Sequence, residues 1–136
     1  MKVLTDKVTF STSDEEVKDL TKEVQRKVKE SGVEEGICLL FAPHATGVLI
    51  LNENEEGIKQ DYLKALNKIV PKEKDWSHDR IDNNAHAHIK SALVGTDRTV
   101  PITDGKLDLG TWQNVFFIET DGPRRKRTVK LKLLGE

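Results

Sequence analysis

Cysteine is nearly absent from this sequence, which limits what can hold its fold together. The 136 residues include one cysteine, Cys38, so an internal disulfide framework is excluded, and a lone thiol fits a reducing cytosol. A chain of this length is expected to form a single domain over residues 1–136, with enough core to fold without disulfides or structural zinc. We therefore expect a compact cytoplasmic protein.

Aromatic residues, long apolar runs and excess charge are also scarce. Aromatics make up 5% of the chain, too few for a platform that stacks nucleic-acid bases, so no nucleic-acid partner is expected. No apolar stretch approaches the ~18 residues that span a bilayer, and the N-terminus lacks a signal-peptide pattern, so no membrane partner is expected either. The net charge of -1 means that any anion-binding site must be local.

Apolar periodicity predicts an α+β fold with about six strands and three helices. Strands are expected at residues 2–10, 36–41, 47–51, 98–102, 115–118 and 128–134. The strand at 36–41 is almost wholly apolar, which is typical of a strand buried on both faces. Helices are expected from the capping box at Ser13–Glu16 to Gly32, from Asn52–Glu55 to Pro71, and from Asn83 to Gly95.

The histidines of the chain are clustered in two short segments. His78, His86 and His88 lie within eleven residues, and His44 follows the strand at 36–41. The pKa of histidine lies near neutrality, so this grouping suits proton transfer or metal binding. On a helix, His86 and His88 point about 200° apart. His88 would then join the inner face with Ala85, Ile89 and Ala92, one turn after Asn84, while His86 would be dispensable.

Two interpretations of the histidines stay open. We expect His44 and His88 to converge in one pocket, although a satisfied core histidine or scattered surface residues would show the same pattern. His44, His78 and His88 favour zinc or another transition ion. Glu53, Asp79 and Asp104 offer the oxygen ligands that Mg²⁺ prefers. Glu53 is equally well explained as a first-turn carboxylate that favours the helix dipole.

A basic run, Arg124-Arg125-Lys126-Arg127, opens the last predicted strand. Alternation along a strand places Arg125 and Arg127 on one face and Lys126 on the other. A half-buried arginine pair would suit phosphate oxygens, which Arg binds with two parallel hydrogen bonds. The alternative is a solvated strand edge that discourages pairing with other chains.

Several short motifs stand out in order along the chain. They are Pro43–Thr46, Asn52–Glu55, His78, Asn84–His88, Gly95, Val100–Ile102 with Asp104-Gly105, Leu109–Gln113, and Asp121–Arg124 followed by Arg127. Taken together, these motifs resemble the YjbQ-like family of small, largely uncharacterised proteins. One departure is Ala45, where many members carry Thr or Ser, which leaves Thr46 as the hydroxyl beside His44.

The resemblance implies a mixed, mostly antiparallel β-sheet curved into a half-barrel or sandwich with about three flanking helices, assembled as a homotrimer. It also implies a weak, secondary thiamine-phosphate synthase activity in some members. That reaction uses a phosphorylated small molecule and expels pyrophosphate, which calls for cations and a divalent metal but no organic cofactor. The alternative is a non-catalytic trimer that binds a metal or an anion.

The residues and the resemblance together define a candidate site with three kinds of member. The catalytic candidates are His44, Glu53, Asn84 and His88. The substrate- or anion-binding candidates are Thr46, Trp112, Gln113, Arg124, Arg125 and Arg127. The metal-binding candidates are His44, His78, His88 and Asp104, which would hold Zn or Mg.

Overall fold

The computed structural model describes residues 1–136 and has an α+β architecture, as expected. The strands are β1 (Lys2–Thr12), β2 (Glu16–Asp19), β3 (Gly36–Phe41), β4 (Gly47–Asn52), β5 (Asp97–Thr103), β6 (Lys106–Leu107), β7 (Asn114–Glu119) and β8 (Arg124–Gly135). The helices are α1 (Thr21–Ser31), α2 (Glu56–Ile69) and α3 (Ala85–Val94), with a short 3₁₀ turn, η1 (Ser77–Arg80), between the last two.

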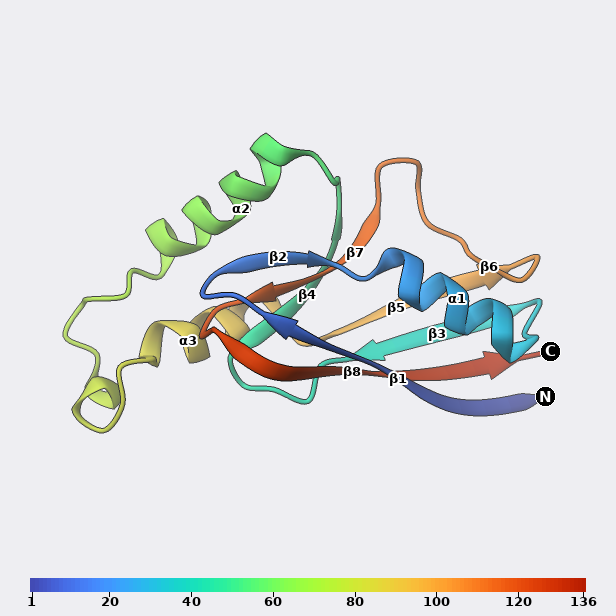
Figure 1. Cartoon of the computed structure of the whole chain (residues 1–136), viewed down its shortest axis with the longest axis horizontal. Coiled ribbons are helices and arrows are strands. Elements are labelled where there is room, and N and C mark those ends of the chain that lie inside the picture. The colour runs from blue at the N-terminus through green and yellow to red at the C-terminus, as the bar shows by residue number, and fades with distance from the viewer.

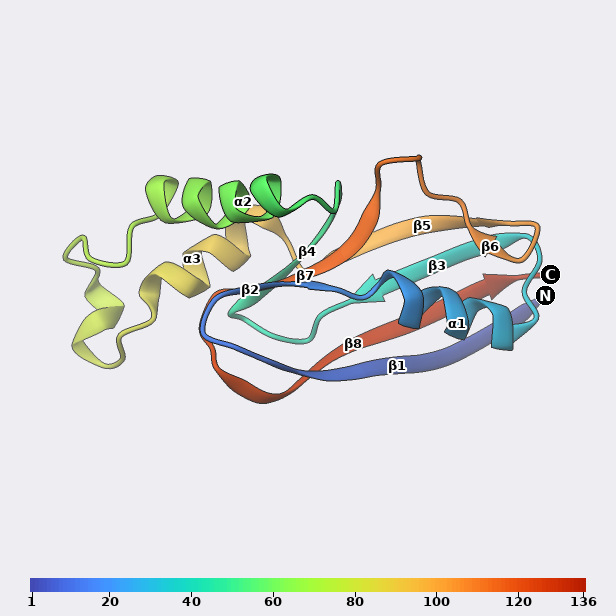
Figure 2. The same ribbon diagram turned by 45° about the horizontal axis from the view of Figure 1, so that its top comes forward.

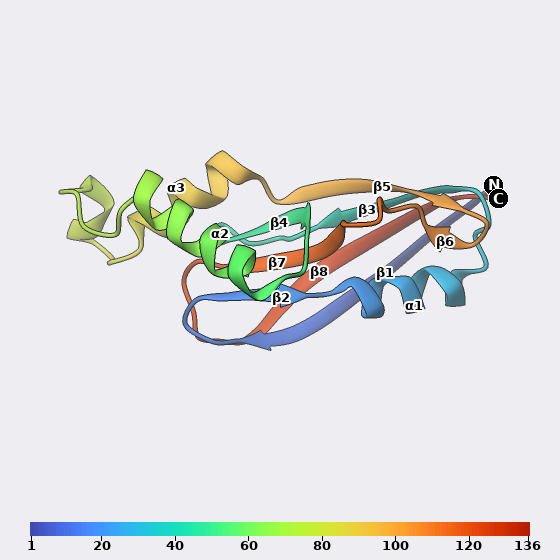
Figure 3. The ribbon, with the colours of Figure 1, turned by 90° about the horizontal axis from the view of Figure 1, so that it is seen from above.

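The strands form two antiparallel sheets that curl into a half-barrel (Figures 1 and 2). One sheet has the order β1-β8-β3-β5-β6 and the other the order β2-β7-β4. Seen from above, α1 lies near the end of the molecule that holds both termini, while α2 and α3 lie at the other end (Figure 3). The curled sheet predicted from the family resemblance is confirmed.

The core lies between the two sheets and under α1. Val24 and Val28 of α1 are fully buried and pack in one cluster with Cys38, Leu131 and Phe117. Burial raises the pKa of the Cys38 thiol to about 12, because an apolar environment disfavours the thiolate. Cys38 is therefore a packing residue rather than a nucleophile.

The first helix begins later than the capping box predicts. Ser13 donates to the Glu16 carboxylate from both its amide nitrogen (3.0 Å) and its hydroxyl (3.2 Å), as in a capping box. The helix nevertheless starts at Thr21, and residues Glu16–Asp19 pair with β7 as β2. The predicted start was wrong because the free edge of β7 offers backbone partners that a single sequence cannot reveal.

Strand β3 is buried on one face, not on both. Cys38 and Leu40 point into the core, whereas Ile37 and Phe41 are each 42% exposed. On the open face, Ile37 lies beside Leu134 of β8 and Pro101 of β5, and Leu134 lies beside Val3 of β1. These side chains form an apolar row across four strands that nothing in the chain covers, which accounts for the apolar sequence of β3.

Helix α3 turns a different face inward from the one predicted. Ala85, His86, Ala87, Lys90 and Ser91 are its buried residues. His88 is half-buried, and Ala92 of the predicted inner face is exposed. The reason is polar anchoring, because the Ser91 hydroxyl donates to the carbonyl of Gly47 (3.0 Å).

No helix of the structure has the length and apolar character needed to cross a membrane.

Candidate functional site

His44 and His88 line one hollow of about 400 Å³ at the α3 end of the molecule. The β3–β4 loop supplies His44 and Ala45, the segment before β5 supplies Gly95 and Thr96, and the first residue of β5 supplies Asp97. The structure therefore brings together the two histidines that the sequence separates by 44 positions. His86 is not among the lining residues.

The His44 ring is fixed against β8. Its Nε2 atom lies 3.0 Å from the amide nitrogen of Thr128 and 3.1 Å from the carbonyl oxygen of the same residue. A backbone N–H can only donate, so in the neutral ring Nε2 accepts and the proton resides on Nδ1. Burial, followed by the charge of Arg127, lowers the pKa of His44, so the neutral form prevails at pH 7.

A buried ion pair underlies this hollow. The Arg127 side chain is 4% exposed and Glu119 is fully buried. Arg127 donates from Nε to Oε1 of Glu119 (2.8 Å) and from Nη2 to Oε2. Nη2 also donates to the carbonyl (2.9 Å) and the hydroxyl (3.1 Å) of Thr46. Arg127 thereby holds the loop that carries Thr46 and His44.

Glu119 stays ionised in spite of its burial. Burial alone would raise the pKa of this carboxyl, but hydrogen bonds from Arg127, Thr12 and the amide of Asp121 outweigh it and lower the pKa. The carboxylate and guanidinium can therefore exist as a charged pair, which is the condition under which a buried pair is tolerated.

A second set of hydrogen bonds leads from the histidines to Arg124. The Asn84 amide donates to Oδ2 of Asp121 (2.8 Å), and its oxygen lies 2.9 Å from Nε2 of His78. The amide nitrogen is thus the donor, so His78 donates from Nε2 and Nδ1 is its free nitrogen. Arg124 donates to the same Oδ2 from Nη2 (2.8 Å). The His78 and His88 rings meet edge to face, with 5.0 Å between centroids.

The basic run does not form the expected half-buried arginine pair. Arg127 is buried and engaged with Glu119, whereas Arg125 and Lys126 are exposed. Arg124 is also exposed but is oriented by Asp121. The alternation expected along the strand applies to Arg127 onward, where Val129, Leu131 and Leu133 share its inward face.

Three predicted site residues lie at the other end of the β4–β7 pair. Gly47 pairs with Glu119 and Asn52 pairs with Asn114, so the two ends of the pair lie about 17 Å apart. Glu53 follows the Asn52–Asn114 end, and Trp112 and Gln113 precede it. Glu53 does not cap α2, because Glu55 fills that role by accepting from the amide of Ile58 (2.9 Å). Within one chain these three residues do not share the hollow with His44.

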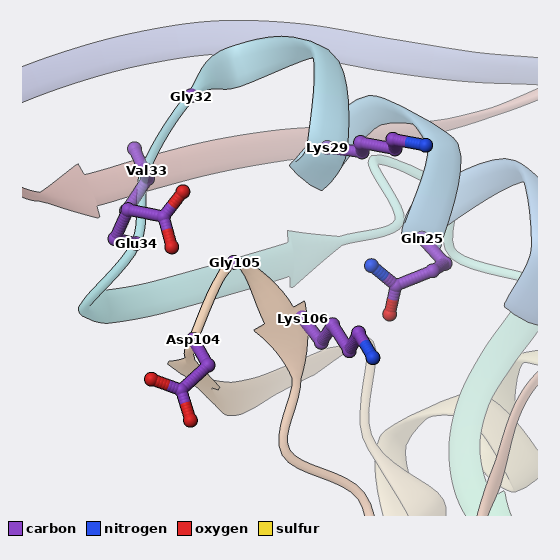
Figure 4. A pocket seen from close by; sticks show the side chains of 8 residues that line it. All are labelled: Gln25, Lys29, Gly32, Val33, Glu34, Asp104, Gly105 and Lys106. Carbon is purple, nitrogen blue, oxygen red and sulfur yellow. The ribbon is translucent and has the colours of Figure 1, made fainter.

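Asp104 lies at a third location. It follows β5, whose first residue, Asp97, lines the hollow of His44. Asp104 instead borders a separate polar hollow of about 420 Å³ near the termini, together with Gln25, Lys29, Gly32, Val33, Glu34, Gly105 and Lys106 (Figure 4). Within one chain Asp104 and the pair His44 and His88 therefore line different hollows, and no group of three His, Cys, Asp or Glu residues is placed to hold a metal ion.

A second polar cluster, between α2 and α3, was not predicted from the sequence. Nζ of the buried Lys90 lies 3.0 Å from Nδ1 of His86 and donates to the amide oxygen of Asn67 (2.6 Å). Asn67 in turn donates to Glu15 (3.0 Å), which pairs with Lys72 (2.9 Å). Burial, followed by the charge of Lys90, lowers the pKa of His86. Helical spacing of His86 and Lys90 was the available signal, but it does not identify Asn67 as their partner.

The fold and site define a class: an α+β protein whose curled antiparallel sheet carries a histidine-lined hollow above a buried arginine–glutamate pair. The chain belongs to the YjbQ-like family, because residues 6–136 match the family model described as UPF0047 protein YjbQ-like.

Relatives support this assignment at the level of sequence and of structure. A UPF0047 protein of Archaeoglobus fulgidus is 44% identical over 114 residues, which cover 84% of this chain and 88% of the relative. A second, from Methanothermobacter thermautotrophicus, is 38% identical and covers 100% of this chain and 95% of the relative. The crystal structure of a YbjQ-like protein of unknown function from Sulfolobus solfataricus has a TM-score of 0.97, with 40% identity and 99% coverage of both chains.

Proposed function

We propose that this protein is an enzyme that acts on a phosphorylated small molecule in the hollow lined by His44 and His88. One observation carries the proposal: the neutral His44 ring lines one hollow with His88, close enough to Arg127 and Arg124 for their charges to act on its pKa. After burial, the charge of Arg127 and, more weakly, that of Arg124 lower the pKa of His44. A dianionic phosphate would complement this positive potential and would raise the pKa of His44 on binding.

The hydrogen-bonding pattern suggests distinct roles for the two arginines. Arg124 uses Nε and Nη2 on Asp121, which leaves Nη1 for a phosphate oxygen. Arg127 uses Nε and Nη2 on Glu119 and Thr46, so it is a positioning residue that sets the His44 loop. Nδ1 of His44 then remains for proton transfer to or from the ligand.

A divalent ion would be held by His78 and His88. Their rings are adjacent, and Nδ1 of His78 is free of the contact with Asn84. Two imidazole nitrogens leave positions for ligand oxygens and water, which is the open arrangement of catalytic sites. Such an ion would neutralise a pyrophosphate leaving group, as thiamine-phosphate synthesis requires. The family resemblance makes that reaction the first one to assay.

Titration with phosphate and pyrophosphate at fixed ionic strength, combined with a thiamine-phosphate synthesis assay, tests this proposal. Arg124→Ala should weaken anion binding by about 1.5–3 kcal/mol, the range for hydrogen bonds to charged groups. Lys126→Ala, the matched control two residues further along the strand, should change anion binding little. His44→Ala and His88→Ala should abolish turnover and retain the fold. Anion binding without turnover of any phosphorylated substrate would favour the non-catalytic alternative.

We also propose that the chain assembles as a homotrimer, as the family resemblance implies. The uncovered apolar row that contains Val3, Ile37 and Pro101 supports an assembly, because contiguous exposed apolar surface commonly marks an interface. Light scattering at micromolar concentration should give three times the 15.4 kDa of the chain. A monomer mass under those conditions would contradict the proposal.

A further inference from the structure

An apolar groove lies between α2 and the sheet, away from the histidine hollow. Its volume is about 190 Å³, and all six lining residues are apolar. They come from four elements, namely Ile50 of β4, Tyr62, Ala65 and Leu66 of α2, Val94 of α3 and Ile118 of β7. Ile118 forms a buried floor, while Ala65 is exposed at the mouth.

The groove stays open because polar contacts fix α2 in place. No residue of α2 is fully buried, although the helix has a continuous apolar stripe. The Tyr62 hydroxyl donates to the carbonyl of Glu53 (3.2 Å), and Asn67 is held between Lys90 (2.6 Å) and Glu15 (3.0 Å). Closing the groove would break these hydrogen bonds, two of which link Asn67 to a charged side chain. The cost of breaking them keeps α2 from packing more closely against β4 and β7.

Trp112 is complementary to this groove, because it is a large apolar side chain that no other part of the chain packs against. It is 71% exposed in the loop between β6 and β7, which projects from the body of the molecule (Figure 1). The loop is ordered by Gln113, whose side chain accepts from the amide of Gly110 (2.9 Å) and whose amide donates to the Gly110 carbonyl (3.0 Å). The indole is therefore held outward rather than left to fold back.

Trp112 does not fill the groove of its own chain. It precedes β7, whereas the groove floor is Ile118 near the other end of that strand, and six residues of extended chain span about 20 Å. A groove of this size suits one aromatic ring system, given that an apolar cavity of about 150 Å³ binds benzene. The chain thus carries both a projecting indole and an empty apolar groove that cannot meet within one copy.

We propose that Trp112 of one copy inserts into the α2 groove of a second copy. The contact joins two different surfaces, so it is heterologous and generates a ring when the rotation closes. The inference rests on the homotrimer proposed above, and it specifies which surfaces meet. The indole N–H can be satisfied by water at the exposed mouth beside Ala65, or by the Tyr62 hydroxyl oxygen, which donates to the Glu53 carbonyl and can still accept.

Two variants test the contact from its two sides. Trp112→Ala removes the indole, and Ala65→Glu places a charge in the groove at a position exposed enough to leave the helix folded. Each should reduce the mass measured by light scattering from three chains to one at the same concentration. Ile81→Ala, which shortens another side chain that is 87% exposed, and Gln60→Glu, which adds the same charge on the exposed side of α2, should leave the mass unchanged.

Mixing the two assembly-deficient variants provides the sharpest test. The Ala65→Glu copy retains the indole and the Trp112→Ala copy retains the groove, so an equimolar mixture should form one contact per pair and stop at a dimer. In a Trp76→Phe background, the emission of Trp112 should shift to shorter wavelength on mixing. Circular dichroism of each variant alone confirms folding.

Three outcomes would overturn the proposal. A wild-type monomer would refute both the trimer and the contact. A trimer that survives Trp112→Ala would leave the assembly standing and refute the contact. Loss of assembly in Ala65→Glu but not in Trp112→Ala would assign the groove to another segment of the partner.

Discussion

The two ends of the β4–β7 pair differ in how completely the chain satisfies its polar and aromatic side chains. At the Gly47–Glu119 end, Glu119, Arg127 and Thr46 are tied together by hydrogen bonds and buried. At the Asn52–Asn114 end, the Glu53 carboxylate and the Trp112 indole have no partner within the chain. The difference indicates that side chains at the Gly47–Glu119 end find all their partners within one chain. Side chains at the Asn52–Asn114 end are left available for a contact with another molecule.

The largest effect on the free energy of unfolding is expected at the Gly47–Glu119 end. Glu119→Ala would leave the buried Arg127 guanidinium without its carboxylate, and breaking a buried pair from one side costs about 3–5 kcal/mol. The free energy of unfolding, measured with urea, should fall accordingly, and Glu53→Ala should change it by less than about 0.5 kcal/mol. Equal effects of the two substitutions would erase the contrast between the ends.

His86 should matter for stability and not for the hollow. His86→Ala would remove the acceptor beside Nζ of Lys90, and an unsatisfied buried donor costs about 1–3 kcal/mol. Anion binding and any metal content should be retained, whereas His88→Ala should reduce them with little loss of stability. If the two variants lost ligand binding equally, His86 would have to reach the site through a neighbouring copy.

Lowering the pH should reduce the free energy of unfolding in two stages. The pKa values of His44 and His86 are lowered in the folded state, so the stability they contribute is complete above the unfolded value of about 6.5 and is lost as the pH falls. The lowered pKa of Glu119 adds a second loss below the ordinary carboxyl range. Urea midpoints from pH 8 to pH 3 should show both stages, and His86→Ala should flatten the first.

The smallest effects are expected at Arg125 and Lys126, the exposed middle of the basic run. Arg125→Ala and Lys126→Ala remove exposed side chains and should change the free energy of unfolding by less than about 0.5 kcal/mol. Arg127→Lys keeps the charge but not the planar fork that binds Glu119 and Thr46, so it should be clearly destabilising. A flat response across all three would mean that the Arg127 pair contributes little to the fold.

Local patterns predicted much of this structure. Strands β3 and β4 and helices α2 and α3 begin and end within about three residues of the positions that periodicity and turn residues indicate. The shared hollow of His44 and His88 followed from strand ends and helix spacing. The element boundaries depend on residues that are close in sequence, whereas the hollow joins two short segments that are each recognisable on their own.

The remainder depends on partners that are distant in sequence. Val17 and Leu20 fit a helical stripe, yet the edge of β7 recruits residues 16–19 into a strand. Arg127 resembled an anion ligand because the buried Glu119 that neutralises it lies on another strand. The apolar sequence of β3 indicated burial, but it could not distinguish a face covered by the chain's own helices from a face left open.

The strand order has a consequence for how the chain is made. β8, the last strand, lies between β1 and β3 in the larger sheet, so β1 has no partner strand until β8 has been synthesised, whereas β3 can already pair with β5. Until then Val8 of β1, which is buried in the finished core, has no sheet to enter. Synthesis at about 5–20 residues per second leaves this unfinished sheet open for several seconds. β1 therefore joins the larger sheet only after β3, β5 and β6 have been made.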